Sequence, residues 1–589
     1  MDPHLDSAER QTLITIEEDL KMRRGQIVYS ALMFICVLAS CAPCSGSSDV
    51  EPLTDAKPLA VLNSTDEDGK KEGSITFLDP ESYRVLNSIE VGRLPSSAFF
   101  GPGENFIYVL SAGGGNRPGS ISVIDVNKRK MTTEIDVGPT KGINPYEHLN
   151  PLYGKWIKIS EDGLKIFLLS SSGDRRDPSR LLVVDRNTNR KTGSLDTAPL
   201  AISYEQSPDG RLIYVLHGAY YKKLPARLTV VDVYNMKIAS EKDLSFGISY
   251  MALSSDKNKL VVISSGLLTS KSKESGMGHL WILDSRSGQE IQSIDLGHKP
   301  SWSVDRLTGD LWTHSTSSQE KSVVRVIRNG SISRQFEVGG GVTKVFPGPA
   351  GEKVFVIYEK GDVSLKDLSG VAKDQQFSLS FKPGYLLVSD DGRRAFLKEA
   401  LGAKVAVLDL ESGRVLAIEK TGRAGQRVGE ALGEALSGVV FGVWILPDVA
   451  QTGMVLGPSD RFLYVLNTQT TDVTIIDTAT AEVIDKIGIG PGVVQQIMPS
   501  PNGQFLITES SQKVQWIDME TNLVVSEYDL RLETKDIPGE ISFREDRGEA
   551  LIPTATGMEI VDLNTGRKIK AIGKLHHPRS ILVPSLPNR

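Results

Sequence analysis

The chain has 589 residues, of which 40% are hydrophobic and 24% are charged, and its formal net charge is -6. This composition is ordinary for a soluble globular protein, and it argues against a nucleic-acid-binding protein, which needs a basic face. The length exceeds one ordinary hydrophobic core, so we expect several domains or a repeat architecture. The three cysteines, Cys36, Cys41 and Cys44, all lie near the N-terminus. The rest of the chain can therefore hold neither a disulfide framework nor a cysteine-based zinc site.

The N-terminal segment has the plan of a secretory signal. The basic stretch Lys21–Arg24 precedes an apolar run from Ile27 to Ala39, which is too short to cross a bilayer, where about 20 residues are needed. Leu38-Ala39-Ser40-Cys41 then resembles a bacterial lipobox. This resemblance implies that Cys41 is lipidated and becomes the first residue of the mature protein. An ordinary signal peptide and a short anchor are the alternatives.

Two neighbouring segments complete the N-terminal region. Residues 1–21 are acidic, whereas the start of a signal should be basic. Translation from Met22 explains this mismatch, and a cytoplasmic extension is the alternative. We therefore assign residues 1–41 to an extension and signal peptide. Residues 42–57 are small, polar and Pro-containing, so they predict a flexible tether.

From Pro58 a short motif recurs to the end of the chain. Its clearest copy is Phe462–Asp477, FLYVLNTQTTDVTIID, in which two apolar runs flank a polar turn, as in a β-hairpin. Each copy continues through a turn into a further strand, and turns such as Ser-Pro-Asp-Gly separate the copies. The copies end at Asp79, Asp125, Asp185, Asp232, Asp284, Ile327, Asp367, Asp409, Asp477, Asp518 and Asp562. Because the acidic residue recurs at the same turn, we interpret it as a turn cap rather than a cation ligand.

Each copy predicts a meander of four short strands. One meander alone cannot bury both of its faces, so the copies must pack on one another around an axis. The copies resemble the YVTN-type β-propeller repeat, most closely in the units that end at Asp125, Asp477 and Asp562. This resemblance implies a secreted or surface propeller, commonly without a known reaction.

The predicted fold is all-β, a β-propeller of about eleven four-stranded blades. Residues 59–63 match the second strand of a blade and residues 580–584 match the first. We therefore expect the two ends of the chain to complete one blade and hide its edges. Because propellers typically have about four to eight blades, two rings are favoured, formed by residues 58–322 and 323–589. One large ring is the alternative.

Two long insertions interrupt the repeat. The first, residues 139–156, suits a ligand or partner surface through Tyr146, His148, Tyr153 and Trp156. A self-packed loop is the alternative. The second, residues 421–456, has apolar residues at every fourth position and then an apolar run that contains Phe441 and Trp444. This run could dock a partner or the membrane, or it could plug a ring or sit between two rings.

Motifs for catalysis are missing from the sequence. It contains no paired-histidine zinc motif, nucleophile elbow or phosphate-binding loop, so we assign no catalytic, cofactor-binding or metal-binding residue. The leading hypothesis is a non-catalytic, lipid-anchored protein of the bacterial cell envelope that binds a protein or polysaccharide through blade-face loops. One alternative is a periplasmic propeller enzyme, lactonase-like or related to quinoproteins, with a site in the central channel. Another is a subunit of an envelope complex.

Overall fold

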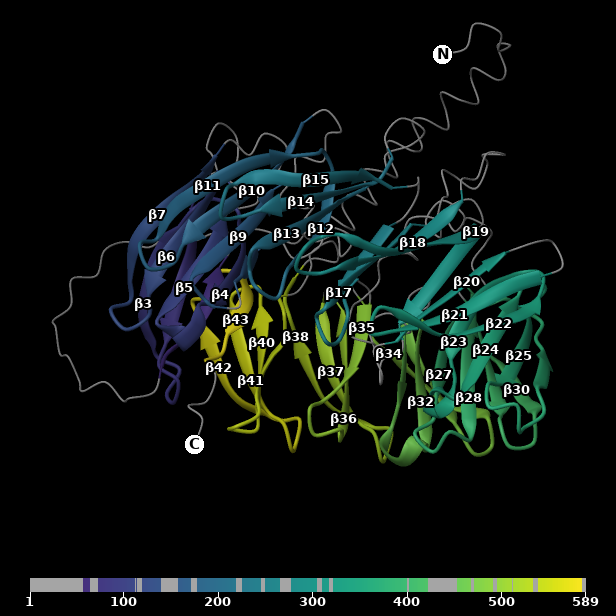
Figure 1. Cartoon of the computed structure of the whole chain (residues 1–589). Coiled ribbons are helices and arrows are strands. Elements are labelled where there is room, and N and C mark those ends of the chain that lie inside the picture. The colour runs from purple at the N-terminus through teal and green to yellow at the C-terminus, as the bar shows by residue number, and fades with distance from the viewer. Residues whose placement is uncertain are drawn as a thin grey trace, which may run out of the picture.

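The computed structural model describes residues 57–63, 72–111, 113, 119–138, 157–160, 162–170, 177–218, 225–244, 249–264, 277–304, 310–316, 321–399, 402–421, 453–467, 471–490, 495–510, 512–532 and 539–584. Regular structure in these ranges is almost entirely β-strand (Figure 1). Short 3-10 turns occur at Pro102–Glu104, Pro349–Gly351 and Pro458–Asp460. None of the helices in these ranges has the length and apolar character needed to cross a membrane.

The strands form eleven blades, each listed from its first strand to its fourth. Blade 1 comprises β43 (Pro578–Leu582), β1 (Leu59–Asn63), β2 (Gly73–Leu78) and β3 (Val85–Val91). Blade 2 comprises β4 (Pro95–Phe100), β5 (Phe106–Ser111), β6 (Gly119–Asp125) and β7 (Lys130–Gly138). Blade 3 comprises β8 (Ile157–Ile159), β9 (Lys165–Ser170), β10 (Ser179–Asp185) and β11 (Arg190–Thr197), and blade 4 comprises β12 (Ala201–Gln206), β13 (Leu212–His217), β14 (Arg227–Asp232) and β15 (Lys237–Asp243). Blades 5 to 7 comprise β16 (Ser249–Leu253), β17 (Lys259–Ser264), β18 (Gly278–Asp284) and β19 (Glu290–Val304); the second half of β19 with β20 (Leu311–Thr316), β21 (Lys321–Arg328) and β22 (Ser331–Gly339); and β23 (Val342–Pro347), β24 (Lys353–Tyr358), β25 (Asp362–Asp367) and β26 (Gln375–Ser378). Blades 8 to 11 comprise β27 (Pro383–Val388), β28 (Arg394–Glu399), β29 (Lys404–Asp409) and β30 (Arg414–Lys420); β31 (Met454–Leu456), β32 (Phe462–Asn467), β33 (Asp472–Asp477) and β34 (Glu482–Gly488); β35 (Gln495–Pro499), β36 (Phe505–Ser510), β37 (Lys513–Asp518) and β38 (Val524–Asp529); and β39 (Ser542–Arg544), β40 (Glu549–Thr554), β41 (Gly557–Asp562) and β42 (Lys568–Gly573).

Every blade is an antiparallel meander, as the sequence predicts. Nine sheets have four strands, and one seven-stranded sheet joins blades 5 and 6 through the long strand β19. The first half of β19 pairs with β18 and its second half pairs with β20, so the strand serves both blades. The prediction of eleven four-stranded blades is confirmed.

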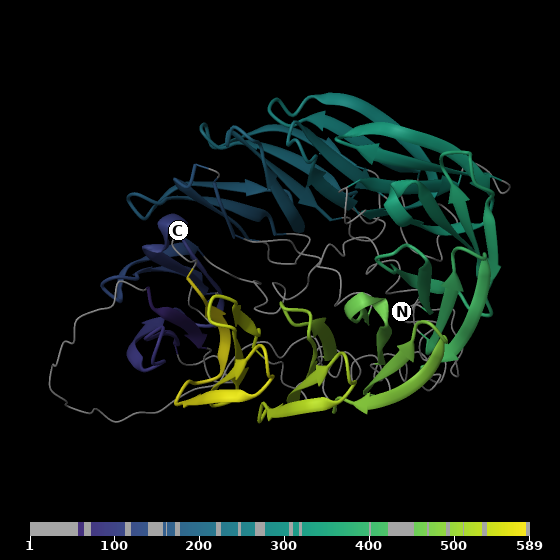
Figure 2. The ribbon, with the colours of Figure 1, turned by 90° about the horizontal axis from the view of Figure 1, so that it is seen from below.

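All eleven blades belong to one closed ring. Eleven clusters of buried apolar side chains each draw residues from two successive blades. The last of these interfaces packs Leu551 and Ile560 of blade 11 against Leu59 and Val61 of blade 1. Figure 2 shows the blades following one another around this ring, from purple through teal and green to yellow. One large ring is thus the arrangement found, and the favoured division into two rings is not.

The predicted boundary at residue 323 marks a variant turn inside blade 6. Residues 322 and 323 both lie within β21, and blade 6 packs on both of its neighbours. Its repeat signal is weak because the turn that follows β21 carries no capping aspartate. Instead, Asn329 and Gly330 adopt φ values of 48° and 61°, which is the backbone of a two-residue type I′ hairpin turn.

The two ends of the chain close the ring within blade 1. Strand β43 pairs antiparallel with β1, with Ala60 opposite Leu582 and Val61 opposite Ile581. The C-terminal strand therefore covers an edge that would otherwise be free to pair with another chain. This pairing agrees with the expectation drawn from residues 59–63 and 580–584.

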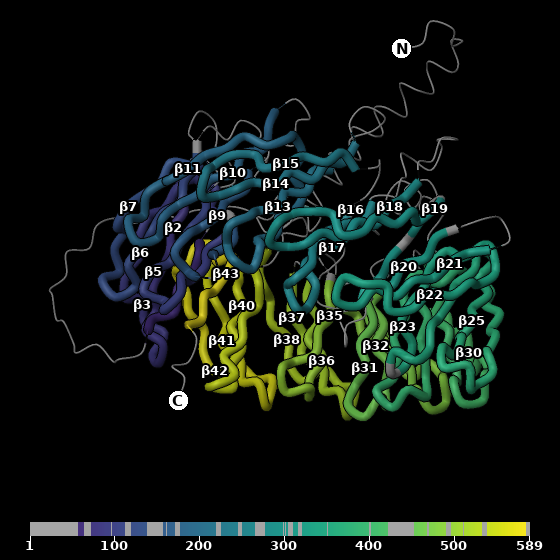
Figure 3. Tube along the Cα trace, in the orientation of Figure 1, coloured from purple at the N-terminus to yellow at the C-terminus, as the bar shows by residue number. Residues whose placement is uncertain are grey.

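The ring has two faces with different connections. The turn face holds the turns between the first and second strands and between the third and fourth strands of each blade. The loop face holds the connections from second to third strand and from each blade to the next. The up-and-down path is visible in β40, β41 and β42 of the trace in Figure 3. The chain enters β1 at the turn face, because Leu59 pairs with Leu78 beside the turn at Asp79. It leaves β43 there too, since Leu582 lies opposite Ala60.

Candidate binding surface

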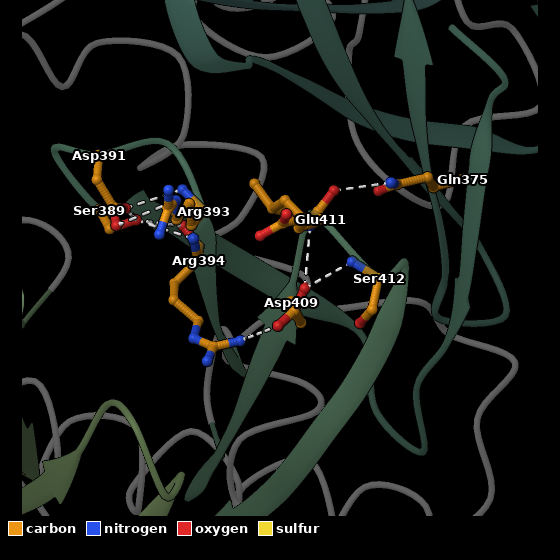
Figure 4. A network of polar contacts seen from close by, with 9 residues as sticks. Gln375, Ser389, Asp391, Arg393, Arg394, Asp409, Glu411 and Ser412 are labelled. Carbon is orange, nitrogen blue, oxygen red and sulfur yellow. Dashed lines mark hydrogen bonds and ion pairs between the residues drawn. The ribbon is translucent and has the colours of Figure 1, made fainter.

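The repeated aspartates cap turns on the turn face. Figure 4 shows this for blade 8, where the Asp409 carboxylate accepts hydrogen bonds from the backbone N–H groups of Glu411 (3.0 Å) and Ser412 (2.7 Å) and pairs with Arg394. The bond from Ser412 is the main cause that holds the pKa of Asp409 below its ordinary value. Equivalent backbone donors meet the aspartates at Asp79, Asp125, Asp185, Asp232, Asp284, Asp367, Asp477, Asp518 and Asp562. Interpreting them as turn caps is therefore confirmed.

The tyrosines of the repeat join neighbouring blades. The Tyr464 hydroxyl donates a hydrogen bond towards blade 10, where Met519 O (3.1 Å) and Asn522 Oδ1 (2.6 Å) lie in the turn that follows β37. The Tyr214 hydroxyl in the same way reaches Ser285 O of blade 5 at 2.9 Å. These side chains are buried, so their phenols bond to main-chain and side-chain oxygens of the next blade rather than to a ligand.

Polar side chains on the first strands of blades 3, 6, 7 and 11 link each of these blades to the next. Lys158 donates to Tyr204 O (2.8 Å) and Lys344 donates to Gly384 O (2.9 Å), while Ser303 and Ser542 reach Val345 O and Ile581 O, both at 3.1 Å. The first strand is the edge of its sheet, so part of its carbonyl groups have no partner within the blade. These donors therefore have a structural role before any other.

The first of three charged groups near this edge lies between blades 3 and 5. Lys158 Nζ lies 2.7 Å from Glu205 Oε2 and 5.1 Å from the centre of the Tyr204 ring. Tyr250, on the first strand of blade 5, is half-buried, and burial followed by the charge of Glu205 raises its pKa to about 12. Its phenol is therefore a neutral hydrogen-bonding group beside a carboxylate.

The second group lies between blades 7 and 9. Lys344 Nζ lies 5.8 Å from the ring centres of both Phe346 and Tyr385, a cation–π arrangement. Burial lowers the pKa of Lys344 to about 8. Lys398 donates to Leu466 O at 3.0 Å, and burial lowers its pKa to about 8 as well. Both lysines therefore release their protons far more readily than exposed lysines do.

The third group is a buried carboxyl in blade 10. Glu509, near the end of β36, is 2% exposed and accepts a hydrogen bond from Gln496 Nε2 of β35. Burial raises the pKa of Glu509 to about 7, against the opposing effect of the bond from Gln496. A carboxyl group of this kind holds its proton at mildly acidic pH, where exposed glutamates are ionised.

The histidines of the described ranges do not assemble a site. His217 and His314 are buried, and burial lowers the pKa of each to about 4, so both are neutral. His217 Nδ1 lies 3.1 Å from Pro199 O. Across the parts of the chain that the structure describes, three or more His, Cys, Asp or Glu side chains never converge in a way that could hold a metal ion.

The residues predicted to bind a partner or lipid lie outside the described residues. These are Cys41, Tyr146, His148, Tyr153, Trp156, Phe441 and Trp444. The strand ends that flank both insertions are described, and all lie on the loop face. The first insertion runs from the end of β7, where Gly138 lies opposite Gly119, to the start of β8. The second runs from the end of β30, where Lys420 lies opposite Lys404, to the start of β31.

Lys398 and Glu509 were missed by reading the sequence. Both occupy the last-but-one position of a second strand, where Leu110, Leu216 and Ile263 stand in other blades. A polar residue at a position that is apolar in several other copies was the signal that could have found them. Gln496 and Lys344, on the short first strands, carry no comparable signal because those strands vary from blade to blade.

Comparisons with known proteins add little to this picture. No family model and no curated protein matches the chain. Similar solved structures include the dihydro-heme d1 dehydrogenase NirN in complex with DHE, at 15% identity and a TM-score of 0.36 over 65% of this chain and 74% of that one. The hydrazine synthase of Kuenenia stuttgartiensis follows at 14% and 0.25 over 74% and 96%, and AztD of Citrobacter koseri at 12% and 0.28 over 74% and 95%. Similarities this low carry no argument about function.

Proposed function

We propose that the chain is a non-catalytic β-propeller of the bacterial cell envelope, anchored by a lipid on Cys41, that binds a protein or polysaccharide on its loop face. The observation that carries this proposal is the placement of connections. Both long insertions leave and re-enter the ring on the loop face, whereas the chain that follows the tether enters on the turn face. Anchor and binding loops would therefore lie on opposite sides of a rigid ring, as a surface receptor requires.

The contacts of the described residues favour a binding role for the two insertions over a role in building turns or blades. Aspartates, tyrosines and first-strand lysines are engaged in holding the blades together. The polar side chains that recur in the repeat thus stabilise the ring. Aromatic side chains such as Trp156 and Trp444 fall where the repeat is interrupted, and loops carried on a rigid scaffold are where binding residues concentrate.

Two experiments test the two halves of the proposal. Replacing Cys41 by Ser should move the protein from the membrane fraction to the soluble fraction, and unchanged fractionation would refute the lipid anchor. For binding, retention on isolated envelope material is measured with Cys41→Ser proteins, which lack the lipid, and adding Trp156→Ala and Trp444→Ala should abolish it. A matched variant on the turn face outside the basic hairpins, Ile484→Ala, should keep it. Equal retention by the Cys41→Ser protein and both variants would contradict a loop-face site.

One observation favours the second candidate, a propeller enzyme. The pKa values of about 7 for Glu509 and about 8 for Lys344 suit proton transfer near neutral pH. Hydrolysis of a lactone panel by the purified protein, lost in Glu509→Gln, would support this candidate. Hydrolysis that persists unchanged in Glu509→Gln would remove Glu509 from that role.

A further inference from the structure

Exposed apolar side chains gather on the turn face. Of the fourteen large hydrophobic side chains that are exposed among the described residues, thirteen lie in turn-face hairpins or in the first three residues of the strand that follows: Val85, Met131, Leu164, Tyr234, Ile238, Ile291, Val371, Leu416, Ile484, Leu523, Val524, Val525 and Ile569. The exception is Met277, beside the start of β18 on the loop face. Single exposed hydrophobic residues are normal on protein surfaces, so their charge surroundings must decide which of them form a site.

The surroundings differ sharply between two parts of the turn face. In blades 2 to 4, the hairpin segments 125–131, 185–191 and 232–238 carry seven basic residues against three acidic ones, and the three acidic ones are the turn caps. In blades 9 and 10, the equivalent segments 477–484 and 518–525 carry no basic residue and four acidic ones. Of these two parts, only the first combines exposed apolar side chains with an excess of basic residues. A smaller basic hairpin occurs in blade 11, where Arg567 and Lys568 precede the exposed Ile569.

We call the first part the turn patch. It comprises the exposed apolar Met131, Leu164, Tyr234 and Ile238, which are 43%, 46%, 66% and 40% exposed, and the exposed basic Lys128, Lys130, Arg190, Lys191 and Lys237. Its hairpins are neighbours, since Lys165 Nζ of blade 3 lies 4.4 Å from the centre of the Tyr234 ring of blade 4. A tyrosine and aliphatic side chains among lysines is the composition of a surface that binds at the interface of an anionic bilayer.

The path of the chain brings the turn patch close to the predicted anchor. The chain enters the ring beside blade 2, where Lys57 Nζ donates to Gly103 O (2.7 Å) in the turn between β4 and β5. Residues 42–57 separate this point from Cys41 and span at most about 58 Å when fully extended. A lipid on Cys41 would therefore hold blade 2 and its neighbours within reach of the bilayer surface.

We propose that the turn patch rests on the surface of an anionic lipid bilayer, so that the loop face points away from the membrane. This inference deepens the proposed function and depends on it for the anchor. The lipid chain supplies attachment, and the turn patch sets orientation. Two weak signals of this kind, one acyl and one basic, are what stable attachment of a peripheral protein requires.

A cysteine-labelling experiment tests the orientation. Because the chain has no cysteine after Cys44, the full chain with Cys36→Ser and Cys44→Ser keeps only Cys41, whose thiol the lipid would occupy. It therefore accepts a single fluorescent label at a chosen site of the ring. Ile238→Cys places the label in the turn patch. Ile484→Cys places it at a similarly exposed isoleucine in the acidic part of the turn face, and Met277→Cys places it on the loop face. The lipidated proteins are reconstituted in phosphatidylethanolamine–phosphatidylglycerol vesicles that contain nitroxide-labelled lipid.

We expect strong quenching at position 238, weaker quenching at 484 and none at 277. Adding Lys130→Gln, Lys191→Gln and Lys237→Gln should weaken the docked state by about a hundredfold, at about fivefold for each lysine. Quenching at 238 should then fall, and raising the salt concentration should have the same effect because salt screens surface charges. Unchanged melting temperatures would show that the variants remain folded.

The remaining outcomes each overturn one part. Equal quenching at 238 and 277 would refute the proposed orientation. If Cys41→Ser releases the protein but position 238 is unquenched in the anchored protein, the lipid anchor is supported and membrane docking of the turn patch is refuted. If Cys41→Ser leaves membrane fractionation unchanged but a label at position 238 is quenched, membrane docking of the turn patch is supported and the lipid anchor is refuted. A label at 238 that is unquenched by lipid but shielded from a water-soluble quencher in native membranes would assign the turn patch to another envelope protein and refute the lipid proposal.

Discussion

The buried Glu509 makes the stability of the ring depend on pH in a direction that can be worked out. Burial raises the pKa of Glu509 from 4.5 to about 7 in the folded protein, whereas an unfolded chain releases this proton near the lower value. Between these two values the folded state binds more protons than the unfolded state. The free energy of unfolding therefore falls as pH rises through this window.

The size of the effect follows from the shift. One pKa unit corresponds to about 1.4 kcal/mol, so the full shift corresponds to about 3 kcal/mol lost between pH 5 and pH 8.5. A ring of about 500 residues has an unfolding entropy of roughly 1 kcal/mol per degree, so this loss lowers the melting temperature by about 3 °C if the ring melts as one unit. Glu509→Gln keeps the shape and removes the titration, so it should remove this part of the pH dependence.

The assay compares melting temperatures of wild type and Glu509→Gln at pH 5 and pH 8.5 by calorimetry. Any pH-independent packing cost of the substitution cancels in the difference between the two pH values. The matched control is Glu527→Gln in the same blade, because Glu527 is half-exposed and pairs with Lys513 at 2.7 Å, which is the main cause that lowers its pKa. Its replacement should leave the pH dependence of wild type. If wild type loses no more stability than Glu509→Gln at pH 8.5, the reasoning about Glu509 is refuted.

Two further predictions concern the contacts that hold the ring. Glu549 is buried, accepts a hydrogen bond from the Tyr83 hydroxyl and pairs with Arg544 at 3.6 Å. Glu549→Ala removes this carboxylate from the contact between blades 11 and 1 and should cost about 3 kcal/mol, the lower end for breaking a buried ion pair, because Asp546 still pairs with Arg544 at 3.6 Å. The exposed pair of Lys321 with Glu337 is the control, and Glu337→Ala should melt like wild type. Tyr464→Phe removes the hydroxyl that bonds blade 10 and should cost about 1–3 kcal/mol, whereas Tyr234→Phe at an exposed turn should cost nothing measurable by urea unfolding.

The strands and the blade count could be predicted because each copy repeats the same local rules. Two apolar runs, an aspartate cap and a glycine turn recur at a fixed order, and each signal is contained within a few neighbouring residues. The closure by β43 was equally predictable, since residues 59–63 and 580–584 match different strands of the same repeat unit.

The number of rings could not be predicted because it depends on the shape of the interfaces between blades. Phe396 and Val405 of blade 8 pack on Leu463 and Val465 of blade 9, and the volume of such side chains sets the angle between successive sheets. A strand with these residues has the same sequence pattern whether its blade belongs to a small ring or to a large one. The weak copy near residue 323 was misleading for a local reason, because a turn of Asn329 and Gly330 needs no capping aspartate.

The placement of the unusual charged residues could be predicted from the sequence, but their pKa values could not. Glu509 and Lys398 break an apolar position of the second strand, so their unusual placement is present in the sequence. Their pKa values are not, because these depend on how completely the neighbouring blade covers each side chain. The roles of Tyr146, His148, Tyr153, Trp156, Phe441 and Trp444 remain predictions, since these residues lie outside the described part of the chain.

The division of the ring into two faces explains where function can reside in a repeat of this kind. A turn on the turn face spans a few residues and closes on an aspartate or serine side chain, as Asp409 and Ser389 do, so an insertion there would break the cap. A connection on the loop face carries no such requirement, and both long insertions occur there. Because β1 starts at the turn face, a tether and a partner would engage opposite sides of the ring. Attachment and recognition are then separated by the same topology that builds each blade.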